Sequence, residues 1–96
     1  MINVKSLKFD ADAKLLEYVD KKVGKVEKFF DNLGDVDVTL SLLPDAQNKC
    51  VKLQTRIPGE DLIVERQADT FEEAVTAAAD ALKERIVRAK ERKFDR

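Results

Sequence analysis

An enzyme built from this 96-residue sequence would have to rely on Asp, Glu, Lys or Arg side chains alone. There is no histidine and only one cysteine, Cys50, which excludes Ser-His-Asp triads, Cys-His pairs and ordinary zinc sites. Cys50 lies in an alternating segment, which indicates a buried or half-buried structural side chain in a reducing compartment. Asp35 and Asp37 could act as paired carboxylates on one face of a strand, but their alternating context favours solvated side chains. We therefore predict a protein that is not an enzyme and that holds no metal or cofactor.

Basic side chains are more informative, because they gather in two segments. Residues 81–96 carry seven basic and three acidic side chains in a chain of net charge −1, and residues 21–28 carry four lysines and one glutamate. Solvation of helix faces would explain any one of these residues, and a helix C-terminus favours a few of them. Seven basic residues within residues 81–96 are more than solvation and the helix C-terminus require, and they favour contact with a phosphate backbone. The candidate RNA-binding residues are Lys21, Lys22, Lys25, Lys28, Lys83, Arg85, Arg88, Lys90 and Arg92.

Periodicity predicts the elements that position these residues. A helix over residues 13–30, capped by Asp12, has an apolar residue every three or four positions, and Asn32 and Gly34 end it. Thr70 opens a second helix, over residues 70–93, with a capping-box pattern. Alternation predicts strands over residues 1–7, 36–42, 51–57 and 62–68, with a loop at residues 44–48 and a Pro58-Gly59 turn.

The order β-α-β-β-β-α predicts an α/β fold of the α+β type, a two-layer sandwich forming one domain over residues 1–96. A right-handed crossover would make the first two strands parallel neighbours, and both helices would cover the same face of the four-stranded sheet. At 100° per residue, a stripe roughly opposite the apolar face contains Lys14, Lys21, Lys25 and Lys28, with Lys22 nearer the boundary with the core. In the last helix three arginines line one flank of the apolar stripe and two lysines the other: Arg85, Arg88 and Arg92, then Lys83 and Lys90. The outward sheet positions lack aromatic residues, so we expect the helices to be the contact surface.

The segment EYVDKKVGKVEKFFD, residues 17–31, resembles the first helix of the ribosome hibernation-promoting and ribosome-associated inhibitor family, also labelled sigma-54 modulation protein. Residues 36–42 and the segment DTFEEAV, residues 69–75, resemble that family in the same order. This resemblance implies a fold similar to double-stranded-RNA-binding domains. It also implies binding to 16S rRNA in the messenger and transfer RNA channel of the 30S subunit or 70S ribosome, with inhibition of translation during stress.

Four positions match basic positions of that family: Lys22, Lys25, Arg88 and Lys90. The last helix departs from it, with Ala81 and Glu84 where basic residues are common and Arg85 where glutamine is usual. The guanidinium of Arg85 could compensate, because it binds phosphate strongly. Long members of that family dimerise ribosomes with a second domain, which we do not expect here because the sequence stops at Arg96. Any ribosome dimers would then need another factor. We also expect a monomer off the ribosome.

No apolar run is long enough to cross a bilayer and no signal core precedes the first charges, so we expect a cytoplasmic protein with neither a membrane nor a small molecule as partner. One alternative function stays open: a protein-interaction regulator of the sigma-54 modulation type that does not act on ribosomes. It would use acidic positions and the exposed sheet face around Asp37, Thr39, Gln54 and Arg56. Gly24 weakens the first helix, which could allow another backbone or a ligand to approach closely.

Overall fold

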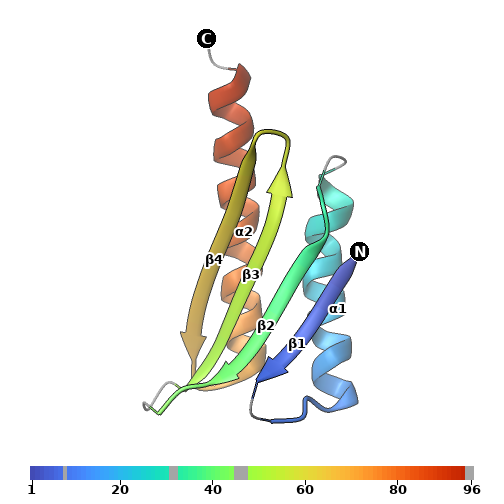
Figure 1. The fold of residues 1–96 in the computed structure, drawn as a ribbon, viewed down its shortest axis with the longest axis vertical. Coiled ribbons are helices and arrows are strands. Elements are labelled where there is room, and N and C mark those ends of the chain that lie inside the picture. Colours follow the sequence, from blue (N-terminus) through green and yellow to red (C-terminus); the bar gives the residue numbers. More distant parts are fainter. Residues whose placement is uncertain (8, 31–32, 45–47, 95–96) are drawn as a thin grey trace.

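The predicted order of elements is confirmed by a computed structural model. It describes residues 1–7, 9–30, 33–44 and 48–94, and for residues 92–94 it describes the backbone only. The elements are β1 (Ile2–Leu7), α1 (Ala13–Phe29), β2 (Val36–Leu42), β3 (Lys49–Ile57), β4 (Glu60–Ala68) and α2 (Phe71–Phe94). Both helices lie on one face of a single sheet, as Figure 1 shows, so the predicted α+β two-layer sandwich is correct.

The four strands follow one another across the sheet in the order β1-β2-β3-β4. β1 pairs with β2 in parallel, with Ile2 opposite Val36, and the other two pairings are antiparallel. β3 and β4 each begin two residues earlier than predicted. Their first residues, Lys49 and Glu60, pair with the neighbouring strand although they do not belong to the apolar alternation on which the prediction rests. The hairpin between them closes through Pro58 and Gly59, and the φ of 86° at Gly59 matches the third position of a type II turn.

The core lies between the sheet and the two helices. The predicted inward positions of α1 and α2 are buried, including Val19, Val23, Leu82 and Ile86 at 0% exposure, except Leu15, which is half-buried in the first turn of α1. Leu42 was expected to continue the inward row of β2, but it is 37% exposed at the end of that strand. Apolar residues on every third or fourth helical position and every second strand position therefore meet in one continuous cluster.

Both predicted N-caps are present. An Asp12 carboxylate oxygen accepts a hydrogen bond from the Leu15 amide at 2.8 Å, and the Thr70 hydroxyl accepts one from the Glu73 amide at 3.1 Å. α1 ends at Phe29, one residue before the prediction, because Phe30 already has extended backbone angles. The predicted stop at Asn32 and most of the predicted loop, residues 45–47, lie outside the described residues.

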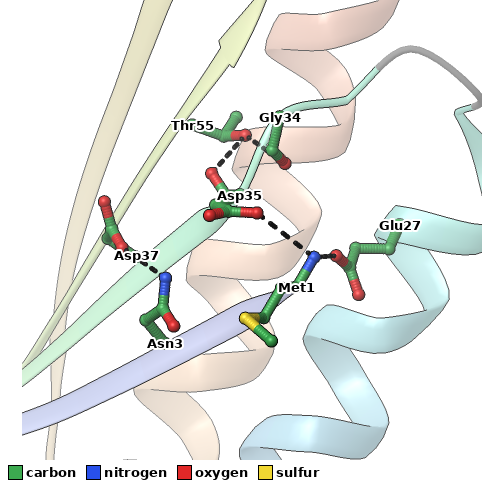
Figure 2. A network of polar contacts seen from close by, with 7 residues as sticks. All are labelled: Met1, Asn3, Glu27, Gly34, Asp35, Asp37 and Thr55. Atoms are coloured by element: carbon green, nitrogen blue, oxygen red, sulfur yellow. Dashed lines mark hydrogen bonds and ion pairs between the residues drawn. The ribbon is translucent and has the colours of Figure 1, made fainter.

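A polar network ties the C-terminal part of α1 to the sheet (Figure 2). The amino terminus of Met1 lies 2.7 Å from a Glu27 carboxylate oxygen and 3.5 Å from one of Asp35. The Thr55 hydroxyl, 3% exposed, donates to the Asp35 carbonyl at 3.1 Å. Since Glu27 precedes Phe29 by half a turn, these contacts fix the end of α1 over the start of β2.

Neither helix, in the part of the chain that is described, combines the length and apolar character needed to cross a membrane.

Candidate RNA-binding groove between the helices

The two helices pack side by side (Figure 1). A surface groove of about 440 Å³ is lined by side chains from both of them. Four of its lining side chains are lysines, three from α1 and one from α2. The lining consists of Lys22, Lys25, Val26, Lys28, Phe29, Thr76, Ala79, Asp80 and Lys83, and we call it the interhelical groove. It has the concave shape and concentrated positive charge that a phosphate backbone would bind.

A hydrogen bond joins the two helices beside the groove. The Tyr18 hydroxyl of α1 lies 2.8 Å from the Thr76 hydroxyl of α2, and the Thr76 hydroxyl also donates to the Glu72 carbonyl at 2.9 Å. The ammonium group of Lys22 lies 5.5 Å from the centre of the Tyr18 ring, within cation–π range. Tyr18 therefore links the two helices and contacts the first lysine of the groove.

Two lysines of α2 reach across to the aromatic pair at the end of α1. The Lys83 ammonium lies 4.4 Å from the centre of the Phe29 ring, and that of Lys90 lies 4.7 Å from the Phe30 ring. Phe30 is buried at 6% exposure, whereas Phe29 is 67% exposed. These contacts hold both ammonium groups above α1, where they add to the charge of its lysines.

The remaining predicted residues do not line the interhelical groove. Lys21 is exposed on α1 outside it. Arg85 and Arg88 are exposed together on one flank of α2, as the sequence pattern predicts, but this flank lies opposite the one whose lysines contact the end of α1. Arg88 pairs with Glu84 at 3.2 Å. The single basic surface expected over both helices is therefore divided in two. The backbone of Arg92 belongs to α2, but its side chain lies outside the described part of the structure. Lys22, Lys25, Lys28 and Lys83 thus share one groove, and Lys90 lies beside the same aromatic pair. Arg85 and Arg88 form a separate basic flank.

Sequence reasoning did not identify Phe29, Thr76 or Asp80 as side chains of the groove. The double phenylalanine at the end of α1 is a signal for the first, because adjacent helical residues cannot both face the core. Asp80 places one carboxylate among the lysines. A second hollow continues from it toward the N-terminal end of α2 and is lined in part by Glu72 and Glu73. The surface between the helices is therefore basic toward the end of α1 and acidic toward the start of α2.

The other side chains considered for chemistry have ordinary structural surroundings. Asp37 accepts a hydrogen bond from the Asn3 side chain at 3.1 Å, and Asp35 lies near the amino terminus (Figure 2). Cys50 is buried, as predicted, and burial raises the pKa of its thiol. Within the described ranges, no three His, Cys, Asp or Glu side chains come close enough together to hold a metal ion.

Comparison with known proteins identifies the family. A family model described as "Sigma 54 modulation protein / S30EA ribosomal protein" matches residues 2–93. The chain belongs to this family. Membership confirms the resemblance seen in the sequence, and it is supported by a curated relative, the ribosome hibernation promoting factor of Azotobacter vinelandii. That protein is 20% identical over 95 residues, which are 99% of this chain and 87% of the relative.

Two solved structures have the same fold as this chain. A ribosomal subunit interface protein from Coxiella burnetii superposes with a TM-score of 0.83 at 17% identity, covering 93% of this chain and 96% of that one. The N-terminal domain of Protein Y from Thermus thermophilus superposes with a TM-score of 0.75 at 23% identity, covering 91% and 93%. At such identities these structures establish the fold alone.

Proposed function

We propose that this S30EA family member is a ribosome hibernation factor that binds the small ribosomal subunit and inhibits translation without catalysis. Its ligand is 16S rRNA in the channel used by messenger and transfer RNA, and residues 1–96 act as one ribosome-binding domain. It works in the cytoplasm as a monomer off the ribosome. The observation that supports this proposal most directly is the set of four lysines in the interhelical groove.

The groove suits a phosphate backbone for an electrostatic reason. The ammonium groups of its lysines are flexible donors, so they fix the position of phosphates without reading sequence. Each neutralised phosphate releases counterions, which makes the affinity fall with salt by a slope of about 0.7–0.9 per contact on logarithmic axes. The arginine flank of Arg85 and Arg88 gives a second place for such contacts on the same helix layer.

Sedimentation with 30S subunits across a range of salt concentrations tests the proposal. We expect salt-sensitive binding of the parent chain. The triple variant Lys22→Ala/Lys25→Ala/Lys28→Ala should bind far more weakly, and its salt slope should be smaller by roughly 2–3. The pair Arg85→Ala/Arg88→Ala, measured in the same way, reports whether the outer flank also contacts RNA.

The sheet supplies a matched control for the charge change. Lys5 and Lys52 lie on the face of the sheet that points away from the helices, so the pair Lys5→Ala/Lys52→Ala loses as much charge as the arginine pair. This control should sediment like the parent. Equal binding by the parent and the triple groove variant would refute the assignment of the groove. Capture of a single protein without ribosomal RNA would instead favour the protein-interaction regulator.

A further inference from the structure

Phe29 is an exposed aromatic side chain in a place where the fold does not require one. It is the most exposed of the aromatic side chains that the structure describes, at 67%, although its neighbour Phe30 is buried in the core. It stands at the last residue of α1 and forms part of the lining of the interhelical groove. The core contact at this end of the helix is already made by Phe30, so the packing of the domain does not account for Phe29.

The surroundings of Phe29 combine an aromatic surface with positive charge. Lys25 and Lys28 line the same groove, and the ammonium of Lys83 lies 4.4 Å from the ring centre. Aromatic side chains within a basic groove are the common means of binding unpaired nucleotides, since every base has a face that stacks and every nucleotide has a phosphate. A continuous duplex keeps its base faces stacked inside and cannot offer them to a side chain.

We propose that Phe29 stacks on an unpaired RNA base, while Lys25, Lys28 and Lys83 bind the phosphates that flank it. In the free protein Lys83 covers part of the ring, and on binding its ammonium exchanges the ring for a phosphate oxygen. The site therefore selects looped, bulged or single-stranded RNA over a continuous duplex. This inference rests on the proposed function, because it names the kind of RNA that the groove takes.

The natural absence of tryptophan provides a direct spectroscopic test. In the Phe29→Trp variant the only indole of the chain would lie at the proposed stacking site. Addition of protein-free 16S rRNA, which contains no indole, should quench this emission, because a stacked base would lie against the ring. Full binding with unchanged emission would overturn the proposal.

Removing the aromatic ring tests the same point by affinity. Stacking on an aromatic side chain contributes about 1–3 kcal/mol per base, so Phe29→Leu should weaken 30S binding by about 5- to 100-fold. Its salt slope should not change, because leucine removes no charge. The matched control is Leu16→Ala, which removes an exposed apolar side chain from α1 outside the groove and should bind normally. Far-UV circular dichroism of each variant checks that the fold is retained. Parent-like affinity of Phe29→Leu would refute the role of the ring.

Two RNA hairpins separate this inference from the proposed function. One hairpin carries a single unpaired purine, and the other has the same stem without it. The parent chain should prefer the first, and Phe29→Leu should lose that preference while it keeps the residual binding to the stem. Equal affinity of the parent for both hairpins would overturn the inference even if 30S binding holds. Failure of the parent to bind 30S subunits would instead overturn the proposed function, and the hairpins would still decide whether Phe29 stacks.

Discussion

Replacement of Gly24 by alanine should stabilise the protein. Gly24 lies in the interior of α1, where glycine is less favourable than alanine by about 1 kcal/mol. A Cβ atom built at this position meets no heavy atom within 4 Å, so the substitution adds no overlap. The free energy of unfolding should therefore rise by about 1 kcal/mol, which for a domain of this size raises the melting temperature by about 4–8 °C.

Urea denaturation followed by far-UV circular dichroism measures this change. Gly34→Ala is the matched control, because a Cβ there would lie 3.2 Å from the carbonyl oxygen of Arg56, which already accepts the Gly34 amide at 2.8 Å. That carbonyl is held in a sheet and cannot move away easily, so we expect a loss of about 1–3 kcal/mol. An unfolding free energy of Gly24→Ala equal to or below that of the parent would refute the argument from open space.

The Gly24→Ala variant also tests whether Gly24 has a role in ribosome binding. No part of the described chain occupies the space beside Gly24. Either the glycine has no role in binding, or a partner approaches the helix backbone at this position. Sedimentation of the stabilised Gly24→Ala variant with 30S subunits separates these cases. Weaker binding by a more stable protein would place a ribosomal component against α1, whereas parent-like binding would leave the glycine without such a role.

Three further substitutions or reactions each test one side chain. Tyr18→Phe removes the hydroxyl bond to Thr76 between the helices and should lower the free energy of unfolding by about 0.5–1.5 kcal/mol in the same denaturation assay; no change would mean that this bond does not hold the helices together. Cys50 should react with a thiol reagent far more slowly in the folded protein than in urea, because it is buried and its thiol pKa is raised; equal rates would contradict that burial. Asp80→Asn removes a negative charge from among the groove lysines and should tighten 30S binding about 2- to 10-fold at low salt; weaker binding would indicate that Asp80 accepts hydrogen bonds from base edges.

Most of the fold could be predicted from the sequence, because in each element the apolar residues recur at the period of that element and face the core. Positions such as Val23 in α1 and Leu53 in β3 occur at the period of their element, and each is fully buried. Strand ends were predicted less well, because Glu60 pairs with Ile57 through backbone groups that no side-chain pattern reports. The exposure of Leu42 has the same origin, since alternation identifies a face of a strand but not where the covering layer stops.

The composition of the groove was predictable only in part. Helical geometry placed Lys83 and Lys90 on the opposite flank of α2 from the arginines, and the structure agrees. Which flank faces α1 depends on how two helices sit on a twisted sheet, and this is a long-range property that local periodicity does not contain. For this reason the sequence supports one basic surface over both helices, whereas the structure separates the lysine groove from the exposed flank of Arg85 and Arg88.

The distribution of charge also determines how the groove can find its ligand. A net charge of −1 gives the molecule almost no long-range attraction to RNA, and at physiological salt charges are screened beyond about 8 Å. Only RNA that already lies close to Lys25, Lys28 and Lys83 is attracted, while Glu72 and Glu73 repel a backbone that approaches the other end of the same surface. Binding should therefore depend on orientation as well as proximity, with the phosphates drawn toward the end of α1. That is also where Phe29 presents its ring, so the charge that attracts the backbone and the surface that would stack a base act at one place.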